Sequence, residues 1–435
     1  MQVAFFEDDS AGNFSPIALL RPVFELVCGR FSLRERVIRR LNVTAWGAFV
    51  RMPLVEVCRE EHPEAQFNGA DWLANGPTLA INGRWLPTAE ALDDARPDDA
   101  GVIGDELAYV TIRPEEAALL DESNWGASIG RLAQSRRIVG AAGRMTHYPW
   151  DLVDHNAEQL TADFPMRDAQ RTAIPANEQV AVLGPADDVC VHPQAQIDPF
   201  VVLDARNGPI SIDAGAVLQS FTRIEGPCHV GRGAQLFRAN VRGGTTIGPV
   251  CRVGGEVEAS ILHGYANKYH DGFLGHSYVC PWVNLGAQTT NSDLKNDYSA
   301  VRVPVEGVAV DTGSNKVGCF IGDHTKTALG SLFNTGSAIG VMCMVLPAGE
   351  LLPKHVPSFS RIWHGVPDDG FDLNSGLQTA RTAMDRRNVE LTEAHQHLLR
   401  HVYEETQPER DAAIERFRKK LASRRVAESP PLVTP

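Results

Sequence analysis

The sequence lacks the features that would mark a zinc-ribbon, secreted or membrane protein. Its eight cysteines are scattered without a CxxC pair, which disfavours a zinc ribbon or a disulfide framework and fits a reducing cytoplasm. No run of apolar residues is long enough to span a membrane. The start, MQVAFFEDDSAGN, has neither a basic flank nor an unbroken apolar stretch, so we expect no targeting sequence.

Lysine is also scarce, because none occurs before Lys268 and arginine greatly outnumbers lysine overall. The formal net charge of −13 disfavours nonspecific binding to nucleic acid, since a polyanion would be repelled. Small anionic ligands remain possible at local basic sites. In the N-terminal part of the chain, such a site must use arginine as its cation.

A length of 435 residues suggests two domains and a tail, and repeats mark the second domain. From Val191 the sequence contains VHPQAQ, IDPFVV, IDAGAV, IEGPCH, VGRGAQ, IGPVCR and VGGEVE, and later IGDHTK and IGVMCM. Each hexamer opens with Ile, Val or Leu and places Ala, Val, Thr or Cys at its fifth position.

This six-residue period predicts a left-handed parallel β-helix over residues 176–360. Three hexamers close one triangular coil, in which the first residue points into a narrow interior and the fifth fits beneath the next corner. Cys228, Cys251 and Cys343 occupy fifth positions. We therefore interpret them as small core residues rather than reactive thiols.

The flanking regions lack this period. Residues 1–175 are predicted to form a mixed α/β domain, with a strand in QVAFFED, a helix in FSLRERVIRRL, a strand and turn in TLAINGRWLP, and short helices in EEAALLDES and DLVDHNAEQLTADF. Residues 361–435 are predicted to form a helical extension. Its helices, at 376–405 and 409–425 with a break near Pro408, would cap the solenoid or pack between subunits.

One histidine falls outside the repeat. The hexamer ILHGYA begins at Ile261 and the period resumes at Leu274, so residues 267–273 belong to no hexamer. His270 is therefore not needed to fill the core. Loop histidines often have no function, and spacing alone leaves both interpretations open.

The segment around His270 resembles the acetyltransferase domain of the bifunctional N-acetylglucosamine-1-phosphate uridyltransferase and glucosamine-1-phosphate acetyltransferase family. VGGEVE, then Lys268 and His270, then Leu274-Gly275 and LGAQT match that family's motif in order and spacing. The chain is more similar still to a variant bacterial form. Its matching segments are FED, RPVFELVCG, INGRWLP, YPWDLVDHN, YHDGFLG, TNSDLKN and IGDHTKT.

For the solenoid, this resemblance implies N-acetyl transfer from acetyl-CoA to glucosamine-1-phosphate. Its implied residues are His270 as general base, Asn291 as substrate-orienting amide, Arg252 and Lys268 as phosphate ligands, and Lys316 and Lys326 as candidates to hold coenzyme A. A neutral imidazole can take the proton of an attacking amine near physiological pH. Asn291 is equally a turn residue, and both lysines at 316 and 326 also fit a solvated face.

Two departures from the family concern the sugar. A second family lysine has no match near Ser260 and Ile261, and Phe273 replaces the family's tyrosine. These changes leave the reaction class intact but put the identity of the sugar in doubt.

For the N-terminal domain, the resemblance implies uridylyl transfer from UTP with Mg²⁺. The usual glycine-rich loop and its lysine are absent, since the chain reads FFEDDSAGNFSPIALLRPVFELVCG there. Arginine can bind phosphate bidentately, so Arg21, with Arg34, is the expected substitute. Asp8 and Asp151 are the candidate Mg²⁺ ligands, although acidic turns are common on protein surfaces.

Together these implications predict synthesis of UDP-N-acetylglucosamine by a homotrimer with active sites between subunits. Three alternatives stay open. The first is a nucleotidyltransferase for another sugar-1-phosphate with a solenoid acyltransferase domain. The second is a trimeric sugar-nucleotide sensor or scaffold. The third is a zinc lyase using His263, His270 and His276, which lack the histidine spacing of that class.

Overall fold

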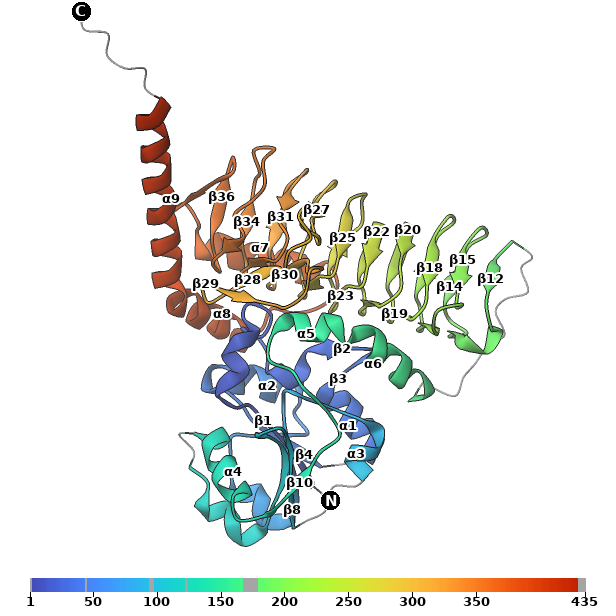
Figure 1. Cartoon of the computed structure of the whole chain (residues 1–435), viewed down its shortest axis with the longest axis vertical. Helices are drawn as coiled ribbons and strands as arrows, with labels where there is room; N and C mark the ends of the chain where they lie inside the picture. The colour runs from blue at the N-terminus through green and yellow to red at the C-terminus, as the bar shows by residue number, and fades with distance from the viewer. Residues whose placement is uncertain (1, 44, 94–97, 122–123, 167–178, 429–435) are drawn as a thin grey trace, which may run out of the picture.

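The computed structural model describes residues 2–43, 45–93, 98–121, 124–166 and 179–428. It has an N-terminal α/β domain, a solenoid of short parallel strands and a helical C-terminal extension, as the sequence predicts (Figure 1). The predicted boundary at residue 175 lies outside the described residues. None of the described helices is both long and apolar enough to cross a membrane.

A seven-stranded sheet in the order β10-β8-β9-β6-β1-β4-β5 organises the N-terminal domain. Its strands, in chain order, are β1 (Gln2–Phe6), β4 (Trp46–Phe49), β5 (Gln66–Phe67), β6 (Thr78–Asn82), β8 (Asp99–Ile103), β9 (Glu106–Ile112) and β10 (Arg137–Gly140). From β1 the chain moves to β4 on one side and later returns to β6 on the other, both parallel to β1. The carboxyl ends of β1 and β6 therefore form a switch point, where open α/β sheets place ligands.

The local sequence explains most of these elements. β1 is an almost wholly buried apolar run, as expected for a strand inside a parallel sheet. α1 (Leu33–Leu41) begins at a capping box in which Ser32 and Glu35 exchange hydrogen bonds. α2 (Val55–Glu61) packs with α1 on one face of the sheet, and α4 (Trp125–Ala133) packs on the opposite face. The helix predicted in EEAALLDES is instead a 3-10 helix, Pro114–Leu119, which begins at Pro114. Such helices occur as short pieces like this one.

The solenoid is built from parallel sheets stacked coil on coil. One sheet has nine strands: β13 (Val189–Val191), β16 (Ile210–Ile212), β19 (Cys228–Val230), β21 (Thr245–Ile247), β23 (Ile261–Leu262), β26 (Tyr278–Val279), β30 (Cys319–Ile321), β33 (Ser337–Ile339) and β35 (His355–Val356). Another includes β20 (Gln235–Val241), β22 (Arg252–Glu258), β24 (Asn267–Lys268) and β25 (Phe273–Gly275).

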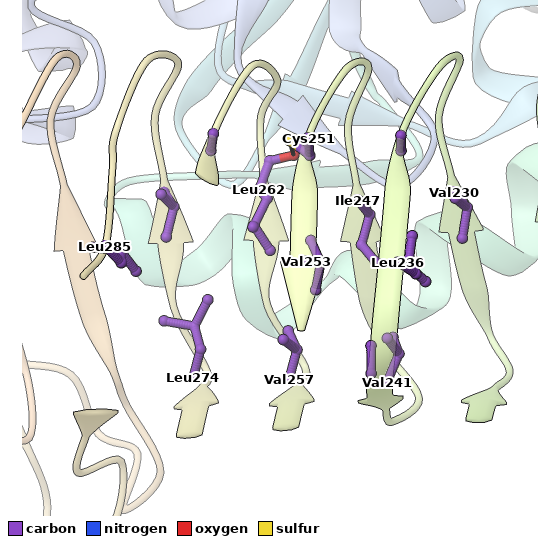
Figure 2. Close-up of a cluster of buried hydrophobic side chains, with 14 of the residues drawn as sticks. Val230, Leu236, Val241, Ile247, Cys251, Val253, Val257, Leu262, Leu274 and Leu285 are labelled. Atoms are coloured by element: carbon purple, nitrogen blue, oxygen red, sulfur yellow. Dashed lines mark hydrogen bonds between the residues drawn. The ribbon is translucent and has the colours of Figure 1, made fainter. Parts of the chain in front are cut away.

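The interior of the solenoid confirms the six-residue pattern. Figure 2 shows Leu236 and Val253 aligned on one wall, and Val257 and Leu274 on another, with their side chains directed into one core. The fifth-position cysteines at 228, 251 and 343 are fully buried in the same cluster. Burial of this kind contributes about 25 cal/mol per Å² of apolar surface, so the stacked coils stabilise one another.

The N-terminal domain covers one face of the solenoid. α5 (Pro149–Asp154) and α6 (Asn156–Asp163) lie against the sheet that contains β19, β21 and β26 (Figure 1). The amide of Asn156 donates to the carbonyl of Gly244 at 2.8 Å, and the Val27 N–H donates to the Tyr278 hydroxyl at 2.9 Å. The single closing helix predicted in DLVDHNAEQLTADF is thus two helices that meet at His155.

The C-terminal extension begins later than residue 361. β36 (Arg361–Trp363) continues the parallel ladder from β34 (Met344–Val345), and α7 (Leu373–Asp385) follows. The helix predicted at 376–405 is divided into α7 and α8 (Glu393–Glu405), because Asn388 is left-handed, with φ of 56°, and Thr392 caps α8. α9 (Gln407–Glu428) carries Pro408 in its first turn, next to the predicted break.

Candidate functional site

A cluster of polar residues gathers at the carboxyl ends of β1 and β6. Asp8 accepts two hydrogen bonds from the Arg84 guanidinium, at 2.8 and 2.6 Å, and one from the Asn82 amide at 2.9 Å. Burial opposes the charge on Asp8, but these donors and the Ser10 N–H outweigh it and lower its pKa. Asp8 is therefore a fixed anion at the switch point.

Arg84 links this cluster to the YPWD segment. Its Nη1 donates to the Thr146 carbonyl at 2.8 Å and lies 3.3 Å from His147 Nδ1. The Asp151 carboxylate accepts from the N–H groups of His147 and Tyr148, at 2.6 and 3.1 Å, and so caps α5. The FED, NGR and YPWD segments, far apart in the sequence, meet here.

The predicted Mg²⁺ ligands do not face each other as a ready pair. The oxygens of Asp8 are occupied by Arg84 and Asn82, and the contacting oxygen of Asp151 caps a helix. Among the described residues, no group of three or more His, Cys, Asp or Glu side chains is placed to hold a metal ion. The polar cluster around Asp8 therefore does not fit a preformed metal site, and the role of Asp8 and Asp151 as ligands stays a prediction.

The two predicted phosphate-binding arginines lie elsewhere. Arg21 is bonded to both carboxylate oxygens of Asp323, on the solenoid, with one of these contacts at 3.0 Å. Arg34 is paired with Glu25. The structure does not bring either guanidinium into contact with Asp8.

Other residues near this polar cluster were not singled out from the sequence. Glu7 accepts from the N–H of Val23 at 3.0 Å and forms an ion pair with Arg51, which follows β4. Arg51 also donates to the carbonyls of Ala18 and Arg21, at 2.8 and 3.0 Å. These bonds fix the loop that replaces a glycine-rich one. The quoted INGRWLP motif was the available signal for Asn82 and Arg84.

On the solenoid, His270 is exposed at the corner between β24 and β25. The corner holds extra residues relative to β22, which runs continuously past it through Gly254 and Gly255. A side chain at position 254 would place its Cβ 2.0 Å from the Tyr269 carbonyl oxygen, so glycine is required there. This corner faces away from the N-terminal domain.

Lys268 supports the segment that carries His270. Its ammonium group is buried and donates to the carbonyls of Gly254 and His270, at 2.7 and 2.8 Å. Burial lowers its pKa to about 8, and the nearby Asp271 only partly offsets that effect. The nitrogen predicted to bind a phosphate is thus occupied by backbone oxygens.

Asn291 and Arg252 occupy different environments. The buried Asn291 amide exchanges hydrogen bonds with the N–H and C=O of Gly275, at 2.9 and 3.0 Å, which favours its structural interpretation. Arg252 is half-buried on the outer face of the coil, beside Asn267 of the next coil. Burial, and after it the charge of Arg252, lowers the pKa of Arg387.

The two predicted coenzyme A lysines also separate. Lys316 Nζ lies 3.7 Å from a carboxylate oxygen of Glu258. Lys326 donates to the Trp282 carbonyl at 2.5 Å, and burial lowers its pKa to about 8. Lys326 also lines a cavity of about 740 Å³ between the outer face of the last coils and α7, together with Met344 and Trp363.

The structure adds an oriented histidine that the sequence considered only as a zinc ligand. His276 Nδ1 lies 2.8 Å from the Asp293 carboxylate, at a different corner from His270. His276 lines a cavity of about 390 Å³ with Asp154 of α5. Burial, followed by the charge of Asp151, raises the pKa of Asp154 to about 6. A histidine held by a carboxylate has the geometry of a general base.

Comparison with known proteins agrees with this two-part arrangement. Residues 3–172 match the family described as sugar nucleotidyl transferase. The chain is 32% identical over 92 residues, 21% of its length, to a bifunctional sugar-1-phosphate nucleotidylyltransferase/acetyltransferase of Sulfurisphaera tokodaii. It is 28% identical over 164 residues, 37% of its length, to the putative uncharacterized acetyltransferase YaiX of Escherichia coli K12.

These matches cover 23% of the Sulfurisphaera protein and 65% of the Escherichia coli protein. The chain thus spans less than two thirds of either relative. The comparisons show that residues 3–172 are similar to sugar nucleotidyl transferases and that the chain has relatives described as acetyltransferases.

Proposed function

We propose that the chain is a bifunctional transferase that makes UDP-N-acetylglucosamine. Its solenoid would transfer acetyl from acetyl-CoA to glucosamine-1-phosphate, and its N-terminal domain would transfer uridylyl from UTP to the product. The family match over residues 3–172 and the bifunctional relative support the reaction classes. The observation that carries the proposal is the glycine-enabled corner that holds His270 outside the hexapeptide core.

For acetyl transfer, the exposed imidazole of His270 accepts a proton as the sugar amine attacks the thioester carbonyl. The new C–N bond forms, the C–S bond breaks, and the proton passes to the leaving thiolate. The cavity that contains Lys326 is lined mostly by apolar side chains and suits the pantetheine arm of acetyl-CoA. Arg252 remains a candidate for the sugar phosphate.

For uridylyl transfer, the region around the carboxyl ends of β1 and β6 supplies arginine rather than lysine. Arg84 has a side chain only 3% exposed and is neutralised by Asp8 and Glu106. It therefore holds the surrounding segments in place. Arg51, with a side chain 33% exposed beside Glu7, is the more accessible cation for a phosphate group. Mg²⁺ would neutralise triphosphate charge in such a reaction, and we assign it no ligand here.

We also propose a homotrimer. Phe200 and Phe221 stack in parallel, with ring centroids 5.7 Å apart, on the same corner of the solenoid as His270. They are 53% and 68% exposed, and Leu329 farther along the corner is 72% exposed. Exposed apolar side chains in a row favour contact with another subunit.

A substrate matrix tests both activities. Nucleoside triphosphates are assayed against sugar-1-phosphates, with and without acetyl-CoA, by following pyrophosphate and free thiol. We expect thiol release with glucosamine-1-phosphate and pyrophosphate release with UTP and N-acetylglucosamine-1-phosphate. Turnover with a different sugar or nucleotide would support the alternative sugar-1-phosphate specificity. Binding of sugar nucleotides without any turnover would favour the sensor or scaffold.

A further inference from the structure

A cavity at the interface of the three parts has no role in either proposed reaction. It is a cavity of about 720 Å³ bounded by the N-terminal domain, the covered face and edge of the solenoid, and the turn between α7 and α8. Its volume is typical of a small-molecule site. Asp8, Asn82 and Arg84 do not line it, so it is separate from the polar cluster at the carboxyl ends of β1 and β6.

The carboxylates around this cavity are mostly engaged. Asp213 is paired with Arg30 at 2.9 Å, Asp323 with Arg21, and Glu25 with Arg34. Two others, on α2, face α8: Glu60 accepts from Thr392 at 2.6 Å, and Glu61 lies 3.3 Å from His395. Glu35 belongs to the capping box of α1. Glu390, which precedes α8, also lines the cavity and is exposed. Three of the seven lining carboxylates are thus paired with arginine.

Two other arginines that line the cavity keep their charge available. Arg39 and Arg232 line the cavity, are exposed, and pair with no carboxylate among the described residues. Arg39 is held over the Phe31 ring, with its guanidinium carbon 4.8 Å from the centroid. Arg30 adds a buried guanidinium nitrogen, Nη1, that has no hydrogen-bond partner within the described part of the chain. Guanidinium groups from two domains converge on the same space, as an anionic ligand requires.

A column of rings forms the other end. Tyr265 stacks on Trp282 with centroids 4.4 Å apart and an interplanar angle of 25°, and Trp282 is nearly parallel to His324 at 6.2 Å. His324 is buried, and its Nδ1 has no hydrogen-bond partner among the residues that the structure describes. Burial lowers the pKa of His324 to about 3, so this ring is neutral and can donate or accept one hydrogen bond.

The coils fix the separation of these two ends. The N–H of Val250 bonds to the carbonyl of Arg232, and the N–H of Tyr265 bonds to that of Pro249, so the corner residues 232, 250 and 265 lie on successive coils. Strands in a sheet are about 4.8 Å apart, which places Tyr265 roughly 10 Å along the axis from Arg232. This separation matches the reach from the base to the phosphates of a nucleotide.

We propose that this cavity binds a nucleoside phosphate, with its phosphates at Arg232 and Arg39 and its base against Tyr265 and Trp282. The unpartnered nitrogens of Arg30 and His324 mark both ends as incomplete without a ligand. The site joins all three parts of the chain, so its occupant contacts the helical extension as well as both domains. It does not depend on either transferase activity.

Equilibrium dialysis of the full chain with UDP, ADP and inorganic pyrophosphate tests this site. We expect the double variant Arg39→Ala/Arg232→Ala to weaken one class of UDP or ADP sites at least tenfold. Tyr265→Asn should have the same effect on UDP and ADP but not on pyrophosphate. Asparagine tolerates the left-handed backbone of Tyr265, whose φ is 52°, so the ring is removed without backbone strain.

Matched controls are Arg302→Ala and Tyr298→Asn. Arg302 is exposed at the start of the hairpin formed by β28 (Arg302–Val305) and β29 (Val308–Asp311), and Tyr298 is exposed just before it, with a positive φ of 56°. Both controls should bind as the wild type does. Unchanged UDP and ADP binding in the arginine double variant would overturn the proposal. Pyrophosphate binding as tight as UDP binding, with no effect of Tyr265→Asn, would disprove recognition of the base. Loss of uridylyl transfer at saturating UTP in the double variant would show a substrate site instead.

Discussion

His270 and His276 lie on one coil but differ in how their rings are held. His270 is exposed, and its ring contacts Tyr269 edge-on at 5.8 Å. His276 has its Nδ1 fixed by Asp293, which leaves Nε2 as the proton acceptor. The motif selects the first histidine and the hydrogen bond favours the second, so the two must be compared directly.

We expect His270→Ala to lower kcat for acetyl transfer by about 10²–10⁴-fold, the usual contribution of a general base. Thiol release from acetyl-CoA with glucosamine-1-phosphate measures this. His397→Ala, at an exposed histidine on α8, is the control and should keep wild-type activity. Retained activity in His270→Ala, with loss in His276→Ala, would move the base to the His276–Asp293 pair.

At the scale of elements, the corner between β24 and β25 depends on the buried amine of Lys268. Its hydrogen bonds to Gly254 and His270 tie the extra residues to the neighbouring coil. A folded pKa of about 8, below the ordinary 10.5, means that the native state binds fewer protons than the unfolded chain between these two values. Stability must therefore rise with pH in that window.

We predict that the unfolding free energy of the wild type rises between pH 8 and 10, relative to Lys268→Met, by about 1–3 kcal/mol. Lys326 has a similar shift but is present in both proteins, so it cancels. Urea unfolding at several pH values provides the measurement. Parallel pH profiles for the two proteins would show that Lys268 is not the group responsible.

For the whole molecule, Arg21 and Asp323 join the N-terminal domain to the solenoid. Their side chains are 12% and 3% exposed, so loss of one partner leaves a buried charge. Arg21→Ala should lower the unfolding free energy by about 3–5 kcal/mol, and Arg21→Met/Asp323→Leu should recover most of it. Chemical denaturation measures both. If Arg21 serves docking, the double variant keeps its KM for UTP, whereas a large rise in KM would place Arg21 in the nucleotide site.

Assembly is predicted to use the corner opposite the N-terminal domain. Phe221→Asn keeps the left-handed backbone, since φ there is 68°, and removes an exposed ring. We expect sedimentation velocity to show a trimer for the wild type at micromolar concentration and weakened association for the variant. Tyr298→Asn, at an exposed tyrosine elsewhere, should leave assembly intact. A monomeric wild type would contradict the shared-site model.

The sequence alone determined the solenoid and the outward position of His270. Six-residue periodicity acts locally, because each coil buries its own inward residues against the coils directly above and below. The six-residue period identified the fifth-position cysteines, and apolar patterning identified β1 and α1. It missed the breaks at His155 and Asn388, because apolar periodicity continues across a single turn that reorients a helix.

Only the tertiary structure decided which charged groups meet. Arg21 pairs with a residue 302 positions away, and Arg84 joins Asp8 across 76 positions. The first pair forms where the two domains dock, and the second forms between neighbouring strand ends of one sheet. The energy of a buried charge depends on partners that spacing does not reveal. The predicted roles of Arg21, Lys268 and Asn291 came from motifs, whereas their actual contacts came from packing. Repeats fix the local path of the chain, and long-range burial selects the partners of its charges.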